Sequence, residues 1–137
     1  MRVCILGHGL SSLTLAKALV NQNIYVEIIS NKKNQKRGLS RTLGISKSNI
    51  NFFNKNIINI EKLLWKLKKI EIYADNLKNE KLLNFEKNND QIFSIIKNHD
   101  LHRLLEKDLL KSKYFRKSYF KNVNLSFLKD YNIIINC

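Results

Sequence analysis

The sequence predicts an α/β protein built on a parallel β-sheet, and three observations in its first thirty residues predict this fold class. Arg2 to Leu6 is a short apolar run, as in a strand that is buried on both faces. Leu10 to Gln22 carries apolar residues at helical spacing, and Ile24 to Ile29 returns to β-branched and aromatic residues. Because a strand–helix–strand crossover is right-handed, the two strands are expected to run parallel.

The next part of the chain predicts a loop followed by a helix. Asn31 to Ser46 is polar and is expected to be a long loop. Ser46 or Ser48 can cap the helix that follows, because a serine hydroxyl accepts a hydrogen bond from the first backbone N–H groups. Ile60 to Leu67 extends the helical pattern. The apolar positions that predict the first part of this helix are Ile50, Phe52, Phe53 and Ile57.

The second half of the chain predicts added strands around one further helix. Alternating apolar and polar residues favour a half-exposed strand, and a run of leucines at helical spacing favours the helix. The predicted strands are Ile70 to Asp75, Lys81 to Phe85, Gln91 to Ile95, Tyr119 to Phe127 and Asn132 to Asn136, with a turn at Lys87 to Asp90 and the helix at Asn98 to Leu110.

Length and composition are typical of one globular domain: the chain has 137 residues, of which 44% are hydrophobic. No apolar run approaches the roughly eighteen residues of a membrane helix, so no transmembrane segment and no signal peptide are expected. Cys4 and Cys137 stand far apart without metal-ligand spacing. We therefore expect no metal site and a location in the reducing cytoplasm.

The formal net charge of +14 would suit a nucleic-acid-binding protein, but the composition argues against that function. Lysine, asparagine and isoleucine, whose codons are rich in A and T, fill 56 of the 137 positions, and proline is absent. Most lysines are dispersed singly or in pairs, and the densest clusters are residues 32–37 and 111–121. The charge is therefore expected to reflect base composition, and no nucleic-acid partner is expected.

A glycine turn between the first strand and the first helix predicts a dinucleotide-binding, Rossmann-like fold. Gly7 allows the tight turn, and Gly9 allows a pyrophosphate to approach the backbone. The N–H groups of Leu10, Ser11 and Ser12 open the helix and would face the phosphates. Ser12 replaces the third glycine of the fingerprint and is small enough for close helix–strand contact. The alternative is an ordinary glycine turn without a ligand.

The acidic residue of the dinucleotide fingerprint is missing from its usual place. Glu27 lies twenty residues after Gly7, but it falls inside the second strand and is interpreted as structural. Ser30 occupies the carboxyl end of that strand, where the ribose-binding acid belongs. A hydroxyl followed by Lys32 and Lys33 would suit a 2′-phosphate, so an NADP-binding oxidoreductase domain is one alternative, and a weakened site is another.

The segment Arg41-Thr42-Leu43-Gly44-Ile45-Ser46-Lys47-Ser48 favours flavin. It resembles the R-x-x-A-L-S-x-x-S stretch of flavin-dependent aromatic-ring monooxygenases, especially the ubiquinone-biosynthesis hydroxylases. The resemblance implies that Arg41 contacts the flavin dinucleotide, a role that suits a fixed cation with several donors. An ordinary surface arginine is the alternative.

Less specific similarities to the same family occur further along the chain. Asn98 holds the position of a polar residue that contacts flavin in the family, three places before the helical Leu101. His99 is expected to begin that helix, and His102 and Arg103 are expected to be solvated. Trp65 and the strand from residue 70 follow the family's order of a helix and then a substrate-side sheet, which is expected around residues 70–96.

The resemblance implies one FAD/NAD(P)-binding Rossmann-like domain over residues 1–137, incomplete at its C-terminus, because the family's Asp-Gly motif would begin directly after Cys137. It implies FAD as cofactor, NADPH or NADH as reductant, and aromatic hydroxylation in quinone biosynthesis. We expect the chain to be inactive alone and to need a separately encoded remainder. A non-catalytic, vestigial dinucleotide-binding module is the other alternative. No Ser/His/Asp, paired-carboxylate or metal constellation identifies catalytic residues.

Overall fold

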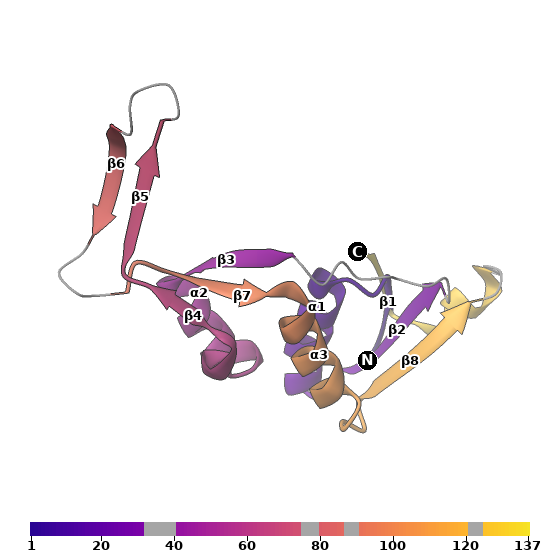
Figure 1. Cartoon of the computed structure of the whole chain (residues 1–137). Coiled ribbons are helices and arrows are strands. Elements are labelled where there is room, and N and C mark those ends of the chain that lie inside the picture. Colours follow the sequence, from indigo (N-terminus) through magenta and orange to yellow (C-terminus); the bar gives the residue numbers. More distant parts are fainter. Residues whose placement is uncertain (32–40, 75–79, 87–90, 121–124) are drawn as a thin grey trace.

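The strands form three sheets, of which the largest is parallel (Figure 1). The computed structural model describes residues 1–31, 41–74, 80–86, 91–120 and 125–137. The predicted turn at 87–90, Lys32 and Lys33 lie outside these described residues. In the described residues the chain is a mixed α/β protein with a parallel sheet, as the strand–helix–strand pattern predicts.

The parallel sheet has the order β8-β2-β1-β9. Its strands are β1 (Arg2–Leu6), β2 (Tyr25–Asn31), β8 (Phe115–Phe120) and β9 (Ile133–Asn136). Helix α1 (Leu10–Asn21) connects β1 to β2. All three strand pairs run parallel, so the predicted β1–α1–β2 unit is confirmed.

The order of the strands reverses at β1. Val3 of β1 lies opposite Val26 of β2 on one side and opposite Ile133 of β9 on the other. The chain therefore builds the sheet outward through β2 and β8 before it returns to add β9. In open parallel sheets, ligands bind outside the carboxyl ends of the strands at such a reversal. The glycine turn follows β1 at that place.

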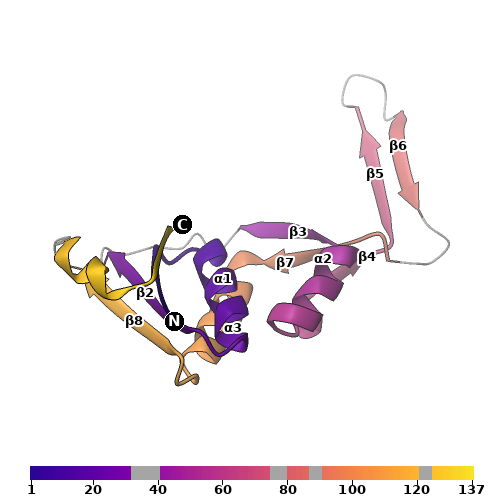
Figure 2. The same cartoon turned by 180° about the vertical axis from the view of Figure 1, so that it is seen from behind.

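A second, antiparallel sheet has the order β3-β7-β4 and carries short helices on its connections (Figures 1 and 2). It consists of β3 (Thr42–Ser46), β7 (Phe93–Lys97) and β4 (Trp65–Leu67). Between β3 and β4 lie α2 (Lys47–Phe52), a π-helical turn (Phe53–Ile57) and a 3₁₀ turn (Glu61–Leu63). Ser46 caps α2: its hydroxyl accepts a hydrogen bond from the Asn49 N–H at 3.3 Å.

Two of the sequence predictions are wrong in this region. The expected loop from Asn31 to Ser46 ends as strand β3, because pairing with β7 satisfies the backbone of residues 42–46. The expected helix at Ile60 to Leu67 is only one 3₁₀ turn, followed by β4. Asparagine side chains explain this break: Asn54 Oδ1 accepts from the Ile60 N–H at 2.9 Å, and Asn59 Oδ1 accepts from the Glu61 N–H at 3.0 Å.

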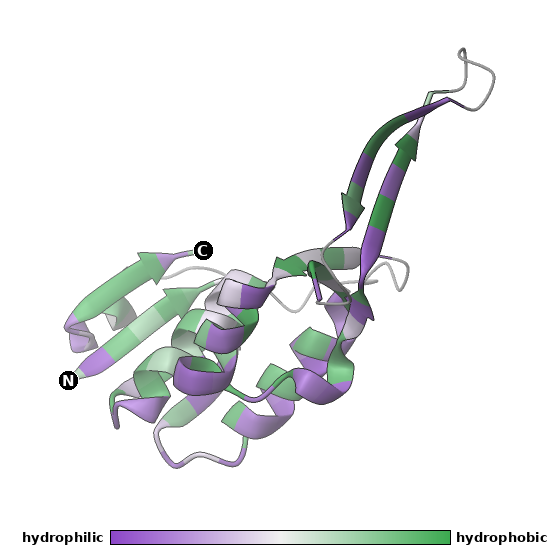
Figure 3. Cartoon of the chain, turned by 90° about the vertical axis from the view of Figure 1, so that its left-hand side faces the viewer, coloured by the Kyte–Doolittle hydropathy of each residue, from purple (hydrophilic) through white to green (hydrophobic). Residues whose placement is uncertain are grey.

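The third sheet is a hairpin, β5 (Lys69–Tyr73) and β6 (Lys81–Glu86), that projects from the rest of the molecule (Figures 1 and 3). Its register places Ile70 opposite Phe85 and Ile72 opposite Leu83. The segment around residues 70–96 therefore divides between two sheets, because β7 pairs with β3 and β4 instead of with the hairpin.

Helix α3 (Asn98–Leu109) packs against α1 and completes the core. The strand predicted at Tyr119 to Phe127 is misplaced, since β8 spans residues 115–120 and Leu125–Asp130 is a 3₁₀ helix. None of the helices in the described parts of the chain is long and apolar enough to cross a membrane. The buried side chains that join the two long helices are Leu13, Ala16, Val20, Leu101, Leu105 and Leu109.

Candidate functional site

The first glycine of the turn cannot be replaced by another residue without strain. Gly7 has a φ of +126°, and a Cβ atom there would lie 1.9 Å from the carbonyl oxygen of Cys137. Its N–H donates to the Ile29 carbonyl at 3.0 Å, and the Cys137 N–H donates to the Leu6 carbonyl at 2.9 Å. The end of β9 therefore lies directly against the turn, and only glycine fits both the conformation and the space.

The second glycine faces open space. Gly9 precedes the first turn of α1 with φ −83°, and a Cβ atom built there meets nothing within 4 Å. Leu10 and Ser11 begin the helix, so their N–H groups lack intrahelical partners and lie at the positive end of the helix dipole. An uncovered backbone at a helix N-terminus fits a pyrophosphate, which needs both close approach and N–H donors.

Ser12 lies beneath this turn and is completely buried. Its Oγ is 3.2 Å from the position that a Cβ of Gly7 would occupy. The hydroxyl has no hydrogen-bond partner among the described residues. Ser12 thus takes the place of the third glycine as a small residue that lets α1 approach β1 closely, as predicted.

Glu27 has a structural environment, in agreement with its place inside β2. Its carboxylate is buried and accepts hydrogen bonds from the hydroxyls of Ser118 and Tyr131, the second at 2.7 Å. Burial and then the hydrogen bond to Glu27 raise the pKa of Tyr131 above its ordinary value. Burial and then the charge of Glu27 raise the pKa of the Cys4 thiol to about 11. These hydrogen bonds connect β2 to β8 and to Tyr131, just before β9.

Ser30 lies near the carboxyl end of β2 and is 7% exposed. No acidic side chain occupies that end of β2, which the sequence also indicates. The predicted neighbours Lys32 and Lys33 lie outside the described residues, so the predicted 2′-phosphate site remains a prediction.

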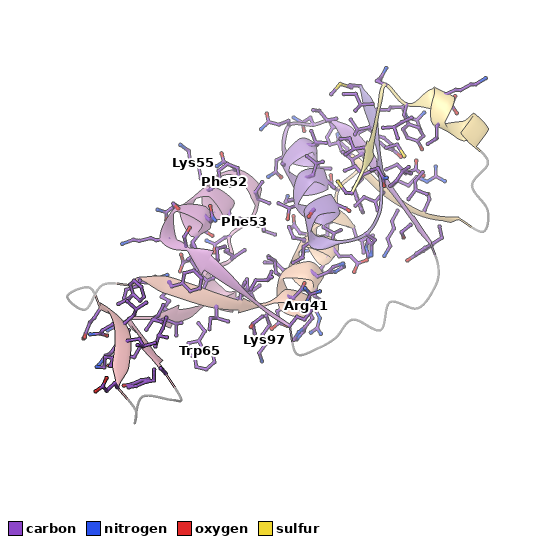
Figure 4. The ribbon with its side chains drawn as sticks, turned by 90° about the horizontal axis from the view of Figure 1, so that it is seen from above. Arg41, Phe52, Phe53, Lys55, Trp65 and Lys97 are labelled. Atoms are coloured by element: carbon purple, nitrogen blue, oxygen red, sulfur yellow. The ribbon has the colours of Figure 1, made fainter. Side chains whose placement is uncertain are left out.

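Arg41 and Asn98 are brought together, although 57 positions separate them in the sequence. The Asn98 N–H donates to the Arg41 carbonyl at 3.0 Å, and the next residue, Thr42, pairs with Lys97. Arg41 and Lys97 are both exposed and lie side by side at one end of the β3–β7 pair (Figure 4). Lys97 is a second cation beside Arg41 that the sequence analysis missed, because only the strand register places it there.

The same end of α3 also contacts the glycine turn. His102 Nε2 lies 3.1 Å from the carbonyl oxygen of His8, the residue between the two glycines. A carbonyl oxygen only accepts, so this nitrogen donates. Asn98 and His102 lie one helical turn apart, so α3 holds both the Arg41 segment and the glycine turn at its N-terminal half.

His102 is 3% exposed, so the expectation that it is solvated is wrong. Its ring meets the ring of His8 edge to face, with centroids 4.8 Å apart. His8 Nε2 lies 3.0 Å from Glu106 Oε1, and Lys117 of β8 donates to the same carboxylate. Helical spacing could have revealed this burial, because His102 lies three residues before Leu105 and seven before Leu109, next to them on the buried face.

Glu106 is the charged centre of this group. Burial alone would raise the pKa of its carboxyl, but the hydrogen bond from Lys117 and the charges of Lys117, His8 and His102 outweigh that effect and lower the pKa. Burial alone would lower the pKa of Lys117. The hydrogen bond to Glu106 is the largest of several effects that outweigh burial, so the pKa is raised overall. The carboxylate and the ammonium group are therefore both charged near pH 7.

An apolar cavity of about 590 Å³ lies beside the first turns of α1. It opens between α1, β3 and α2, where Phe53 contributes an aromatic wall (Figure 4). Such a surface can hold a flat apolar group next to the helix N-terminus. Its apolar lining includes Leu10, Leu15, Leu43, Ile45, Phe53 and Leu101.

No family model and no curated protein matches this sequence. Solved structures do match, and among them are FAD-dependent monooxygenases. PqsL, a probable FAD-dependent monooxygenase from Pseudomonas aeruginosa, has a TM-score of 0.68 and 17% identity, over 87% of this chain and 32% of that chain.

Two further structures agree with this match. p-Nitrophenol 4-monooxygenase PnpA from Pseudomonas putida DLL-E4 has a TM-score of 0.69 at 11% identity, over 85% of this chain and 31% of that one. 2,6-Dihydroxypyridine-3-hydroxylase from Arthrobacter nicotinovorans has a TM-score of 0.61 at 14% identity, over 85% and 28%. The chain thus has a fold that FAD-dependent monooxygenases contain, and it spans about a third of the length of these structural neighbours.

Proposed function

We propose that this chain is the Rossmann-like, FAD-binding part of a flavin-dependent monooxygenase. The observation that carries the proposal is the turn itself: Gly7 is enclosed by Cys137, while Gly9 is open above the N-terminus of α1. That combination leaves one uncovered stretch of backbone where a pyrophosphate can be bound. The structural likeness to FAD-dependent monooxygenases supports FAD over other dinucleotides.

The described residues suggest how the cofactor is held. The N–H groups that follow Gly9 would bind the pyrophosphate, and Ser30 at the end of β2 would face the adenosine ribose. Arg41 and Asn98 would bind the flavin side of the dinucleotide, as the sequence resemblance implies. When bound, flavin supplies the oxygen chemistry of such enzymes, whereas the chain binds it, orients it and excludes water.

The finer assignment rests on the segment from Arg41 to Ser48, which resembles ubiquinone-biosynthesis hydroxylases. We infer an aromatic-ring substrate, NADPH or NADH as reductant, and a role in quinone biosynthesis in the cytoplasm. Reduction of the flavin by either nucleotide in the assembled enzyme, followed through the loss of the flavin's visible absorbance, would test the choice of reductant.

We also infer that the chain acts together with further polypeptide. Its structural neighbours are about three times as long, and apolar side chains of β9 remain exposed, with Ile133 and Ile134 each 44% exposed. A separately encoded remainder would cover that surface and complete the substrate site. Copurification of this chain with the product of an adjacent gene tests this inference, and the chain alone is expected to hydroxylate nothing.

FAD binding is tested by fluorescence titration of the purified chain. Wild type should quench FAD fluorescence saturably, and Gly9→Val should weaken the affinity by about tenfold or more, because its side chain would occupy the space of the phosphates. Gln22→Ala, an exposed residue at the C-terminal end of α1, serves as the control. Riboflavin, which has no phosphate, should bind both variants equally. An unchanged FAD affinity in Gly9→Val would contradict the proposed site.

One observation favours a second candidate, an NADP-binding oxidoreductase domain. Ser30, instead of an acid, lies at the end of β2, and an acid there would repel a 2′-phosphate. Competition between NADPH, NADH and FAD for the wild-type chain distinguishes the two functions. Preference for the 2′-phosphorylated nucleotide over FAD would select this candidate, and no binding of any dinucleotide would favour a vestigial module.

A further inference from the structure

A partly buried group of titratable side chains connects the glycine turn to one helix and one strand. His8 belongs to the turn, His102 and Glu106 belong to α3, and Lys117 belongs to β8. His8 and His102 are 7% and 3% exposed, so their contacts are largely shielded from water. The proposed binding of FAD does not require these side chains, so they have another role.

The group holds the turn at two points of the same residue. His102 Nε2 donates to the carbonyl oxygen of His8 at 3.1 Å, which fixes the backbone. The side chain of His8 reaches in the same direction, with Nε2 3.0 Å from Glu106 Oε1. His102 Nδ1 lies 3.7 Å from Glu106 Oε2, and Lys117 donates to Glu106 from the sheet. The backbone and the side chain of His8 therefore both contact α3.

The helix that provides these contacts also holds the other half of the site. One turn before His102, the N–H of Asn98 donates to the Arg41 carbonyl at 3.0 Å. Helix α3 therefore contacts residues 8 and 41, which are separated by the whole β1–α1–β2 unit. The two contacts start from positions of α3 that lie one helical turn apart, so the helix fixes both segments at once.

A metal site is the competing interpretation of clustered histidine and glutamate side chains. Among the described residues, no group of three His, Cys, Asp or Glu side chains is arranged to hold a metal ion. The ammonium group of Lys117 already contacts the carboxylate that a metal would need. We therefore interpret the contacts of His8, His102 and Glu106 as a structural link between the glycine turn and α3, and we call these three residues the clamp.

We propose that His8, His102 and Glu106 are positioning residues, which clamp the glycine turn to α3 and thereby set the position of the pyrophosphate-binding backbone relative to Arg41. The clamp itself is a property of the fold, while its effect on FAD rests on the proposed function. Because the FAD pyrophosphate and the flavin side would contact opposite ends of this arrangement, loosening the clamp should weaken FAD more than riboflavin.

Two substitutions of His102 separate positioning from simple packing. In His102→Gln, the side-chain amide can still donate to the His8 carbonyl from about the place of Nε2. In His102→Leu, a side chain of similar size fills the space but cannot donate. Asp108→Asn is the matched control on the same helix, because Asp108 pairs with Lys17 of α1 at 2.8 Å, away from the turn.

The first measurement is the ratio of FAD to riboflavin affinity in the 137-residue chain. His102→Leu should lower this ratio by about tenfold, the effect of one lost buried hydrogen bond. His102→Gln and Asp108→Asn should leave it within about twofold of wild type. An unchanged ratio in His102→Leu, or an equal loss in His102→Gln, would overturn the positioning role.

The second measurement needs no ligand: hydrogen exchange of the Gly7, Leu13 and Asn98 amides, which are hydrogen bonded at the turn and at the start of α3. These amides should exchange about tenfold faster in His102→Leu, but not in His102→Gln, while the Asn23 amide at the far end of α1 should be unchanged. If the wild-type chain does not bind FAD, the proposed function is wrong, and hydrogen exchange alone tests the clamp. In that case, unchanged exchange rates in His102→Leu would overturn the clamp.

Discussion

Two glycines separated by one residue have opposite surroundings, and this contrast defines the candidate site at the scale of single residues. Gly7 is enclosed by the end of β9, and Gly9 is open. The fold therefore requires the first glycine, and the second is the one proposed to face a pyrophosphate. Sequence analysis identifies both positions from the fingerprint, but the different surroundings follow from where β9 ends.

Replacement of Gly7 tests its structural role. Gly7→Ala should destabilise the chain by about 2–4 kcal/mol, because it adds left-handed backbone strain to an overlap with the Cys137 carbonyl. Gly9→Ala is the control, with a change below about 0.5 kcal/mol, since its φ is ordinary and its Cβ meets nothing. Urea denaturation of both variants measures the difference. Equal stabilities would mean that β9 does not close over Gly7.

The depressed pKa of Glu106 gives stability a specific pH dependence. A carboxyl whose folded pKa is lowered stabilises the fold above its ordinary value of 4.5, and this contribution is lost as pH falls through the folded pKa. Lys117, with its raised pKa, contributes fully below its ordinary 10.5, and this contribution is lost as pH rises through the folded value. Wild type and Glu106→Gln should therefore differ most in stability between pH 5 and 9 and converge as the pH drops toward 3.

Thermal unfolding of the two proteins across this pH range measures the effect. Asp108→Asn supplies the control, because it removes a carboxylate from the same helix without touching the histidine group. A constant difference between wild type and Glu106→Gln at every pH would show that the Glu106 charge contributes nothing to folding.

At the scale of elements, α1 and α3 pack against each other, whereas the β5–β6 hairpin has no covering layer among the described residues. Helix α3 packs on α1 and contacts both halves of the site. The hairpin β5–β6 projects into solvent, with its apolar residues Ile72, Leu83 and Phe85 between 43% and 51% exposed. A two-stranded sheet without a covering layer is marginally stable in water.

Hydrogen exchange should therefore separate the hairpin from the sheet. Ladder amides of β5 and β6 are expected to exchange on the order of a hundredfold or more faster than those of β1, because the hairpin can open without unfolding the core. Native-state exchange followed by NMR provides the measurement. Equal protection of the two elements would show that the apolar face of the hairpin is covered, for example by a second copy of the chain.

Sequence patterns predict the β1–α1–β2 unit and α3 well, and they predict β8 and the elements of the second sheet poorly. The β1–α1–β2 unit and α3 have clear apolar periods that tertiary contacts reinforce. The segment 60–67 also has helical spacing, yet Asn54 and Asn59 bind the backbone N–H groups that a helix would use, and β7 pairs with residues 65–67. Local periodicity cannot predict competition from a strand that is distant in the sequence.

At the scale of the whole molecule, a charge of +14 and an exposed apolar edge have opposing effects on association. Strand β9 is at the edge of the parallel sheet, and its Ile133 and Ile134 point to opposite faces, each 44% exposed. Repulsion between cationic chains opposes contact at low salt, and screening within about 8 Å at physiological salt removes much of it. Edge strands with apolar faces are templates for pairing.

We therefore expect self-association that increases with salt and depends on β9. Ile134→Lys should shift the chain toward monomer at 0.15 M salt, because it places a charge on the edge strand. Leu110→Lys is the charge-matched control, since Leu110 is 61% exposed as a single side chain at the end of α3. Sedimentation velocity at low and physiological salt measures both variants. If Leu110→Lys has the same effect, net charge and not β9 controls association.

The sequence by itself determined the parallel β–α–β unit and the glycine turn proposed to bind a pyrophosphate, because these depend on local spacing and on glycine's backbone freedom. Its resemblance to flavin-dependent monooxygenases added Arg41 and Asn98. Only the tertiary structure decided that Cys137 encloses Gly7, that Asn98 meets Arg41, and that His102 is buried against His8. Each of these contacts joins segments that are distant in the chain. Their geometry is set by strand order and helix placement, which no local pattern of residues encodes.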